Sequence, residues 1–423
     1  MSDKIAILNK YNSWNSELSA IGFIRQQYLN KMKAFIGNNL IKVLVGQRRS
    51  GKSYLLRQTI SMLIQAGINS KNILYINKEY TDFDFIETYN DLVNLINEYL
   101  SEIKPEGKIY LFIDEVQDIE MWEKAINSYS QNFTQNFEIF ITGSNSNLLS
   151  GELASLLSGR YIKFTVYPYS YPEYISISNV AKSKASFTEY METGGLPELF
   201  NLPLQETKLH YVSSVKDTIM LGDIVKRYTI KDVRLLEDIF SYLINNSSNL
   251  LSIGNIITYF KSKNRKTNYE TISNYIDYLM QSFLIHQAER YSIKGKEIIS
   301  GTNKYYSNDL AFKNYIYPGF SYGLGYKLEN IIYIYLLACD YKVYVGYERN
   351  KEIDFVAIKG DKKLYVQVSY ILVDESTVKR EYSGLESISD NYPKYLVSLD
   401  DVKLASRNGI EHVLAWEFHD LIR

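Results

Sequence analysis

Residues 41–53 read IKVLVGQRRSGKS, and this stretch constrains the fold more than any other part of the chain. Apart from Lys42, the run from Ile41 to Val45 is apolar and rich in β-branched side chains, which is typical of a buried parallel strand. The next eight residues fit the phosphate-loop pattern G-x-x-x-x-G-K-[ST], and apolar residues after Ser53 recur at helical spacing. Strand, glycine-rich turn and helix together predict an α/β domain that binds a nucleotide. The alternative, a chance glycine loop before a helix, would not match every fixed position.

The residue types of the loop suit a polyphosphate. Its two glycines let successive backbone N–H groups point into one concavity at the N-terminus of a helix. We expect Lys52 to reach the β- and γ-phosphates and Ser53 to offer its hydroxyl to Mg²⁺. Arg49 is expected to brace the loop rather than to contact a phosphate. ATP and Mg²⁺ are therefore the predicted cofactors, and the predicted nucleotide-binding residues are Gly46, Gln47, Arg48, Arg49, Ser50, Gly51, Lys52, Ser53 and Tyr54.

Helical stretches separate four further predicted strands, at 73–78, 108–115, 138–144 and 161–167. This alternation favours a parallel sheet with helices on both faces. The second of these strands ends in Asp114 and Glu115, the acidic pair of a Walker B pattern. We expect Asp114 to hold the Mg²⁺ shell and Glu115 to orient or deprotonate the attacking water. An acidic pair on its own would be read as a solvated turn, but its position in the same β/α series favours hydrolysis.

Composition indicates a cytoplasmic globular protein. The net charge is −1 and the pI is near 6.5, so any contact with nucleic acid must come from a local patch. The single cysteine, Cys339, excludes an internal disulfide and suits a reducing compartment. The N-terminus lacks the apolar core of a signal peptide, and the longest apolar run, 331–339, is far shorter than the ~20 residues of a membrane span. We expect no membrane partner.

A helix–turn–helix pattern followed by a hairpin, between about residues 250 and 310, predicts a winged helix with its wing near 285–306. Residues 261–304 carry eight basic and four acidic side chains, which leaves +4. The basic residues are Lys261, Lys263, Arg265, Lys266, Arg290, Lys294, Lys296 and Lys304. This segment could therefore contact DNA through backbone phosphates. The favoured alternative is a lid or protein-docking module with ordinary solvated lysines, because a recognition helix would be more basic than 268–279.

Several motifs in a fixed order make the chain resemble a specific family. It is the prokaryotic AAA+-like ATPases whose P-loop domain precedes a C-terminal domain of unknown function with a restriction-endonuclease-like fold. The motifs are GQRRSGKS, LFIDEVQDIEMWEKAI, ITGSNSNLLSGELASLLSGRY, YPYSYPEY, GGLPELF, GDIVKRY and LENIIYIYLL. Tyrosines stand at 169, 171 and 174, where the family tends to use leucine or phenylalanine. The resemblance covers roughly residues 20–420 and implies ATP binding and hydrolysis.

The resemblance also implies further catalytic groups. AAA+ ATPases place a polar sensor where the strand at 138–144 ends, and either Ser144 or Asn145 fits that role. A capped loop is the equal alternative for each of these two residues. Arg160 is the candidate arginine finger, acting within the chain or from a neighbouring subunit, and a structural salt bridge is its equal alternative.

The last hundred residues return to a mixed α/β pattern, and the resemblance implies a restriction-endonuclease-like fold there. Glu329 on a helix and Asp354 at a strand end fit the order of a nuclease site, but Gln367 and Ser369 occupy the Glu-x-Lys positions. Nuclease chemistry needs those groups for Mg²⁺ and for the attacking water, so we expect a degenerate site. A binding or docking surface is the expected use of this domain.

The predicted fold class is therefore α/β, with a parallel AAA+-type P-loop sheet, a helical lid, a winged helix and a C-terminal α/β restriction-endonuclease-like domain. The predicted boundaries are 1–35 for the N-terminal lead-in, 36–168 for the ATPase core, 169–235 for the lid, 236–315 for the winged helix and 316–423 for the last domain. The predicted function is a Mg-ATP-dependent switch or remodeller with a protein partner or self-assembly. The alternatives are a nucleotide-dependent scaffold with little turnover and an ATP-gated nuclease, against which Gln367 and Ser369 argue.

Overall fold

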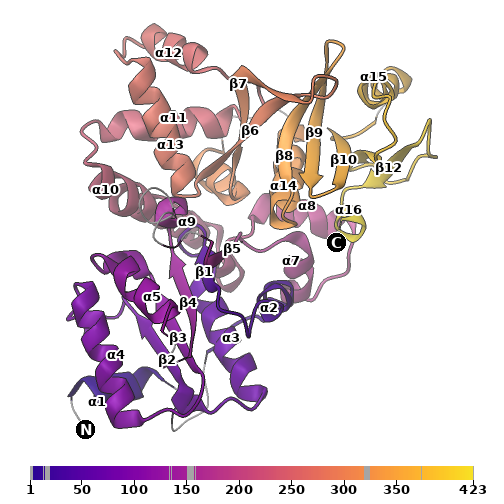
Figure 1. Cartoon of the computed structure of the whole chain (residues 1–423). Helices are drawn as coiled ribbons and strands as arrows, with labels where there is room; N and C mark the ends of the chain where they lie inside the picture. The colour runs from indigo at the N-terminus through magenta and orange to yellow at the C-terminus, as the bar shows by residue number, and fades with distance from the viewer. Residues whose placement is uncertain are drawn as a thin grey trace. The chain divides into compact units, whose positions relative to one another are not determined.

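The chain forms two compact units, residues 1–166 and residues 167–423 (Figure 1). This computed structural model describes residues 3–12, 14, 20–132, 134, 136–149, 157, 159–318, 324–372 and 374–422. Each unit has its own sheet and its own core, and each is described by itself.

The first unit is built on a five-stranded parallel sheet with the strand order β2-β3-β4-β1-β5. Its strands are β1 (Ile41–Val45), β2 (Ile73–Asn77), β3 (Ile109–Asp114), β4 (Phe137–Gly143) and β5 (Tyr161–Thr165). Every residue of β1 to β4 is buried, as expected for apolar strands that are covered on both faces. The predicted parallel sheet is confirmed, with strand ends that differ by one or two residues from the expected ones.

Amphipathic helices cover both faces of this sheet. They are α1 (Asp3–Tyr11), α2 (Gln26–Lys33), α3 (Lys52–Gln65), α4 (Tyr89–Ile103) and α5 (Trp122–Ser130). Helices α2 and α3 lie on one side and α4 and α5 on the other (Figure 1). On the α2–α3 side, Phe112 and Phe140 stack with ring centroids 4.5 Å apart and pack against the apolar faces of both helices. The parallel strand order brings the carboxyl ends of β1, β3 and β4 to one edge of the sheet.

The second unit contains a seven-stranded sheet with the order β12-β11-β10-β9-β8-β6-β7. The strands are β6 (Ile285–Ser292), β7 (Glu297–Ser307), β8 (Lys342–Glu348), β9 (Lys351–Lys359), β10 (Lys362–Ser369), β11 (Lys394–Ser398) and β12 (Ile410–Leu414). Strands β6 and β7 form an antiparallel hairpin, and β6 pairs in parallel with β8. Strands β8, β9 and β10 are antiparallel, whereas β10, β11 and β12 run parallel.

Helices surround this sheet. They are α7 (Tyr171–Ser178), α8 (Lys184–Thr193), α9 (Gln205–Asp217), α10 (Lys226–Tyr228), α11 (Val233–Asn245), α12 (Ile253–Ser262), α13 (Tyr269–Gln281), α14 (Gly325–Ala338), α15 (Glu375–Glu386) and α16 (Phe418–Leu421). Two π-helical segments, Thr218–Val225 and Phe312–Ile316, join the apolar core around α11 and α13. Cys339 is buried in the core around α14. In the described part of the chain, no helix combines the length and hydrophobicity that a membrane crossing needs.

The sheet of the second unit crosses a boundary that the sequence predicted. The hairpin β6–β7 was expected to be the wing of a module ending at residue 315, separate from a domain at 316–423. Instead, β6 pairs with β8 through Arg290 opposite Val345 and Tyr291 opposite Gly346. The hairpin is therefore part of the C-terminal sheet. Pairing with β8 covers backbone groups that would otherwise form an exposed strand edge.

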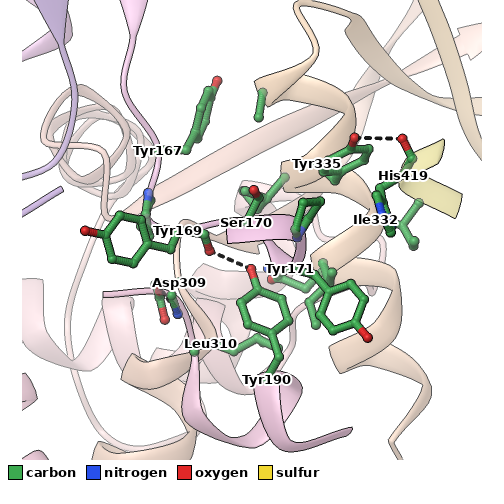
Figure 2. Close-up of a pocket in the computed structure, with 18 of the residues that line it drawn as sticks. Tyr167, Tyr169, Ser170, Tyr171, Tyr190, Asp309, Leu310, Ile332, Tyr335 and His419 are labelled. Atoms are coloured by element: carbon green, nitrogen blue, oxygen red, sulfur yellow. Dashed lines mark hydrogen bonds between the residues drawn. The ribbon is translucent and has the colours of Figure 1, made fainter. Parts of the chain in front are cut away.

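Tyrosines from the YPYSYPEY segment close a small cavity in the second unit (Figure 2). The cavity is about 50 Å³ in volume, and α14 and the C-terminal residues complete its wall. Two further tyrosines of the wall are hydrogen-bonded through their hydroxyls: Tyr190 donates to the Tyr169 carbonyl at 2.8 Å and Tyr335 to the His419 carbonyl at 3.1 Å. This cavity is far too small for a nucleotide.

The GGLP segment wraps the buried carboxylate of Asp309, which also lies at this cavity. The backbone N–H groups of Gly195 and Ala311 donate to this carboxylate at 2.8 and 2.7 Å. Gly194 has a φ of 82°, and a Cβ at this position would overlap Asp309 Oδ1. Burial raises the pKa of Asp309 to about 7, although the N–H donors act in the opposite direction.

Candidate nucleotide site

The phosphate loop connects β1 to α3 in a conformation that depends on its two glycines. A Cβ at Gly46 would overlap the carbonyl oxygen of Val166. Gly51 has a φ of 98° and forms the N-cap of α3, in the left-handed region that glycine adopts without strain. The backbone N–H of Ser50 donates to the Gln47 carbonyl at 3.2 Å. The sequence pattern thus corresponds to a compact turn at the N-terminus of a 14-residue helix.

Lys52 is 4% exposed and points back over this turn. Its ammonium donates to the carbonyls of Gly46 and Gln47 at 3.0 and 3.1 Å, and it lies 3.4 Å from Glu115 Oε1. The positive charge therefore lies inside the loop, where a polyphosphate would compete for it.

The acidic pair lies opposite the loop, at the carboxyl end of β3. Asp114 is fully buried, and its carboxylate accepts hydrogen bonds from Tyr75 and Asn77, each at 3.2 Å. The Ser53 side chain lies near this carboxylate and acts to lower its pKa. Burial and the neighbouring charge of Glu115 raise the pKa of Asp114. The Ser53 hydroxyl and the Asp114 carboxylate are thus adjacent, and both are the hard oxygen donors that Mg²⁺ prefers.

Glu115 has an unusual backbone, with a φ of 54°. Burial alone would raise the pKa of Glu115, but the charge of Lys52 and a hydrogen bond from Gln117 outweigh it and lower the pKa. This carboxylate therefore stays ionised in a buried site, as a proton acceptor must.

Thr142 is a site residue that the sequence reasoning missed. Its hydroxyl donates to Asp114 Oδ1 at 2.5 Å and accepts from the Glu115 backbone N–H at 2.9 Å. It lies near the end of β4, the strand next to β3. Its place near the end of the strand that follows the acidic pair is visible in the sequence, but its contacts depend on the pairing of β4 with β3.

The two sensor candidates differ in their surroundings. The Ser144 hydroxyl is buried and has no hydrogen-bond partner among the residues that the structure describes. Asn145 instead accepts from the Asn147 backbone N–H at 2.6 Å, in the manner of a loop cap. Ser144 is therefore the better placed of the two for a ligand.

The arginines of the region lie in different places. Arg48 forms an ion pair with Glu79 at 2.7 Å, and Arg49 is exposed with a φ of 65°. The loop is braced by Arg25, which is 2% exposed and donates to the Ser50 carbonyl at 3.1 Å. Sequence reasoning assigned that bracing to Arg49 and did not mention Arg25. Tyr54 is 44% exposed, beside the loop.

Arg160 lies at the amino ends of β1 and β5, at the end of the sheet opposite to the phosphate loop. Its carbonyl accepts from the Ile41 N–H at 2.8 Å, at the start of β1, and its side chain donates to Asn127 at 2.9 Å. The phosphate loop begins at the other end of β1, about 13 Å away at ~3.3 Å per strand residue. A contact between Arg160 and the nucleotide would therefore have to come from another copy of the chain.

The predicted nuclease-like residues also come together, in the second unit. Glu329 on α14 and Asp354 on β9 lie 3.0 and 3.3 Å from the ammonium of Lys304. Glu352 lies 2.8 Å from the same ammonium. Burial alone would lower the pKa of Lys304, but these carboxylates outweigh it and raise the pKa. Burial and the charge of Glu329 raise the pKa of Asp354 to about 7.

Gln367 and Ser369 lie on β10, the strand next to the one that carries Asp354. The Gln367 side chain accepts from the Asp354 N–H at 3.3 Å and donates to Glu381 on α15 at 3.0 Å. Ser369 is the last residue of β10, the strand that also carries Gln367, and it is buried. Sequence reasoning found no lysine at this site, whereas Lys304 reaches it from β7. Among the described residues, no group of three or more histidine, cysteine or acidic side chains could hold a metal ion.

The basic segment 261–304 offers less positive surface than its count of charges suggests. Lys304 is 3% exposed on its side chain, inside the carboxylate cluster, and Arg265 pairs with Asp232 and Asp238 at 2.8 Å. Helix α13 carries two acidic residues and no basic residue. The exposed lysines that remain are Lys261, Lys263, Lys266, Lys294 and Lys296.

Comparison with known proteins agrees with the geometry of the first unit. Residues 38–175 match the AAA domain family, and residues 184–321 match a domain of unknown function (DUF8612). An uncharacterized protein of Haemophilus influenzae is 38% identical over 400 residues, which cover 93% of this chain and 98% of the relative. The chain belongs to the same family as this protein. An uncharacterized protein of Methanocaldococcus jannaschii is 30% identical over 390 residues, which cover 86% of this chain and 81% of the relative.

Solved structures align more loosely with this chain. A Walker-type ATPase of Pyrococcus abyssi aligns with a TM-score of 0.43 and 15% identity over 68% of this chain and 94% of its own. The RuvB branch migration motor of Thermotoga maritima aligns at 0.33 and 18%, over 63% and 90%. The Orc1 protein of Aeropyrum pernix, solved in complex with DNA, aligns at 0.33 and 12%, over 71% and 94%. Alignments this loose carry no argument about activity. The AAA domain match and the observed sheet confirm that this chain contains an AAA-type P-loop ATPase-like domain.

Proposed function

We propose that the protein is a Mg²⁺-dependent ATPase that hydrolyses ATP to ADP and phosphate. One observation carries the proposal: Lys52, Ser53, Asp114 and Glu115 converge around one phosphate loop. The AAA domain match over residues 38–175 supports it.

The residues present fit a magnesium–nucleotide complex. Asp114 and Ser53 would hold Mg²⁺, which would neutralise negative charge that develops on the phosphates during transfer. The backbone N–H groups of residues 46–53 and the ammonium of Lys52 would bind the β- and γ-phosphates. Because Lys52 is otherwise bonded to the loop's own carbonyls, these bonds are exchanged for bonds to phosphate.

Glu115 would act on the attacking water. Its ionised carboxylate accepts a proton from the water while the water oxygen bonds to the γ-phosphorus, and the bond from this phosphorus to the β–γ bridging oxygen breaks. Ser144, whose hydroxyl has no hydrogen-bond partner within the described ranges, is the candidate to contact the γ-phosphate or the water. ATP hydrolysis would serve as a switch for the second unit.

Two other functions remain as alternatives to the switch. A scaffold would bind ATP without turnover. An ATP-gated nuclease is disfavoured because the ammonium of Lys304 lies among the carboxylates that a nuclease would use for Mg²⁺. A contact with DNA would rest on the exposed lysines of the hairpin turn, Lys294 and Lys296, because α13 has no basic side chain.

Steady-state ATP turnover by the full chain, with and without duplex DNA, tests the proposal. Glu115→Gln should abolish turnover but keep nucleotide binding, and Lys52→Ala should lose both. Turnover that DNA stimulates would favour a nucleic-acid-coupled switch, and turnover indifferent to DNA would favour a protein partner. Tight binding of ATP without turnover by the wild type would refute hydrolysis and favour the scaffold. Mg²⁺-dependent nicking of plasmid DNA would support the nuclease.

A further inference from the structure

Gln117 makes a specific contact with the proposed general base. It lies in the short 3₁₀ turn Val116–Asp118 that directly follows Glu115. Its side-chain amide donates to Glu115 Oε2 at 2.5 Å. The amide nitrogen must face the carboxylate, because the opposite orientation would place two oxygens against each other.

The three anchors of Glu115 differ in what a nucleotide would do to them. Thr142 holds its backbone N–H, Gln117 holds Oε2, and Lys52 lies 3.4 Å from Oε1. Only Lys52 has another partner to gain when a polyphosphate enters the loop. When Lys52 turns to phosphate, Oε1 becomes available to accept a hydrogen bond from water. Gln117 is then the side chain that still fixes the direction of the carboxylate.

The surroundings of Gln117 leave room for its side chain beside Glu115. Its other end, Oε1, is buried against the end of β4 and has no hydrogen-bond partner in the described part of the chain. A Cβ at Gly143 would lie 2.8 Å from this oxygen and 2.7 Å from the Leu148 side chain. The glycine thus leaves the space that the Gln117 side chain occupies.

We propose that Gln117 is a positioning residue for ATP hydrolysis, which acts by keeping the Glu115 carboxylate directed at the attacking water after Lys52 has turned to the phosphates. This inference rests on the proposed ATPase activity and adds the residue that orients its base. Nucleotide binding does not depend on it, because no hydrogen bond among the described residues joins Gln117 to the phosphate loop or to Lys52.

The test replaces Gln117 by methionine, which has a similar length and no donor. The matched control is Gln131→Met, at an exposed glutamine just after α5 whose amide donates to Asn127. We expect Gln117→Met to lower kcat about 10- to 100-fold, the range for losing one hydrogen bond to a charged group. The dissociation constant of a fluorescent ATP analogue should stay within about twofold of the wild-type value. The control variant should match the wild type in both measurements.

A double-mutant cycle with Glu115→Asp separates positioning from a general structural effect. The shorter aspartate cannot reach Gln117, so adding Gln117→Met to Glu115→Asp should lower kcat by less than about twofold. The same non-additivity should appear in the melting temperatures of the nucleotide-free proteins, which report the contact without any turnover.

Three outcomes would overturn the inference. They are an unchanged kcat in Gln117→Met, equal losses of kcat and nucleotide affinity, or additive effects in the cycle. A wild-type protein that binds nucleotide but has no turnover would instead refute the proposed hydrolysis, and the role of Gln117 would fall with it. The wild-type measurement therefore distinguishes the two failures.

Discussion

The hydroxyl of Thr142 lies 2.5 Å from Asp114 Oδ1 and connects the strand that carries the acidic pair to its neighbour in the sheet. The hydroxyl oxygen of Thr142 also accepts a hydrogen bond from the backbone N–H of Glu115. One side chain thus fixes both the candidate metal ligand and the candidate base. The distance between these two acids depends on the pairing of β3 with β4, and not only on their adjacency in the sequence.

Thr142→Val should therefore reduce ATP turnover while leaving the fold intact. Valine keeps the shape of the side chain but removes both hydrogen bonds, so we expect kcat to fall about 10- to 100-fold. Steady-state turnover and circular dichroism check this. Thr59→Val is the matched control, because Thr59 is also buried but its hydroxyl donates to the Leu55 carbonyl and to the Met32 sulfur, and not to the acidic pair. Equal losses in the two variants would contradict the assigned role.

Lys304→Met should destabilise the second unit strongly. It would leave the buried Asp354 and the largely buried Glu329 without their cation, and breaking a buried pair costs about 3–5 kcal/mol. Urea unfolding measures this. Lys327→Met is the control, because Lys327 pairs with the half-exposed Glu192 and should cost at most about 1 kcal/mol. Similar unfolding midpoints for the two variants would show that the cluster is not held by Lys304.

The stability of the protein should carry a pH-dependent contribution from Asp309. Its pKa in the fold is about 7, above the ordinary value of 3.8, so the folded state holds a proton that the unfolded state releases. This contribution is present at about pH 4 and is lost as the pH rises through about 7. It amounts to roughly 4 kcal/mol at most.

The comparison of wild type with Asp309→Asn isolates that contribution. The asparagine variant cannot ionise, so its free energy of unfolding should fall less between about pH 4 and about pH 8. Urea unfolding across this range gives the two slopes. Parallel slopes would mean that Asp309 is ionised throughout in the folded protein.

Arg160 should act from a second copy of the chain if it acts on the nucleotide at all. We expect Arg160→Ala and Lys52→Ala to be inactive alone, with losses of about a thousandfold for an arginine finger. Mixed together, they should regain turnover, because one copy supplies the intact loop and the other the arginine. Mixing each variant with itself at the same total concentration is the control. A mixture as inactive as its parts would favour a structural role for Arg160 through its hydrogen bond to Asn127.

The sequence predicted the local parts of this molecule well. Strand β1, the phosphate loop and α3 follow one another directly, so apolar runs and fixed glycines specify them without any long-range information. Asp114 and Glu115 were found for the same reason. Their position at the end of a strand is visible in the sequence.

The residues that were missed depend on pairings between distant segments. Lys304 meets Glu329 and Asp354 across 25 and 50 residues of chain, and only the hairpin's place in the sheet brings it there. Arg25 braces Ser50 from a segment that carries no motif. Thr142 reads as an ordinary strand residue until the register of β3 and β4 is known. None of these contacts has a fixed spacing that a sequence pattern could recognise.

The pairing of β6 with β8 has a consequence for how this region can be inherited. The match to the domain of unknown function ends at residue 321, between β7 and β8, and so divides one sheet. A gene fragment encoding only that matched region would produce a hairpin with one bare edge, open to pairing with any other strand, and a buried lysine without its carboxylates. Residues 285–414, which carry β6 to β12, must therefore move together in a recombination that keeps the sheet whole.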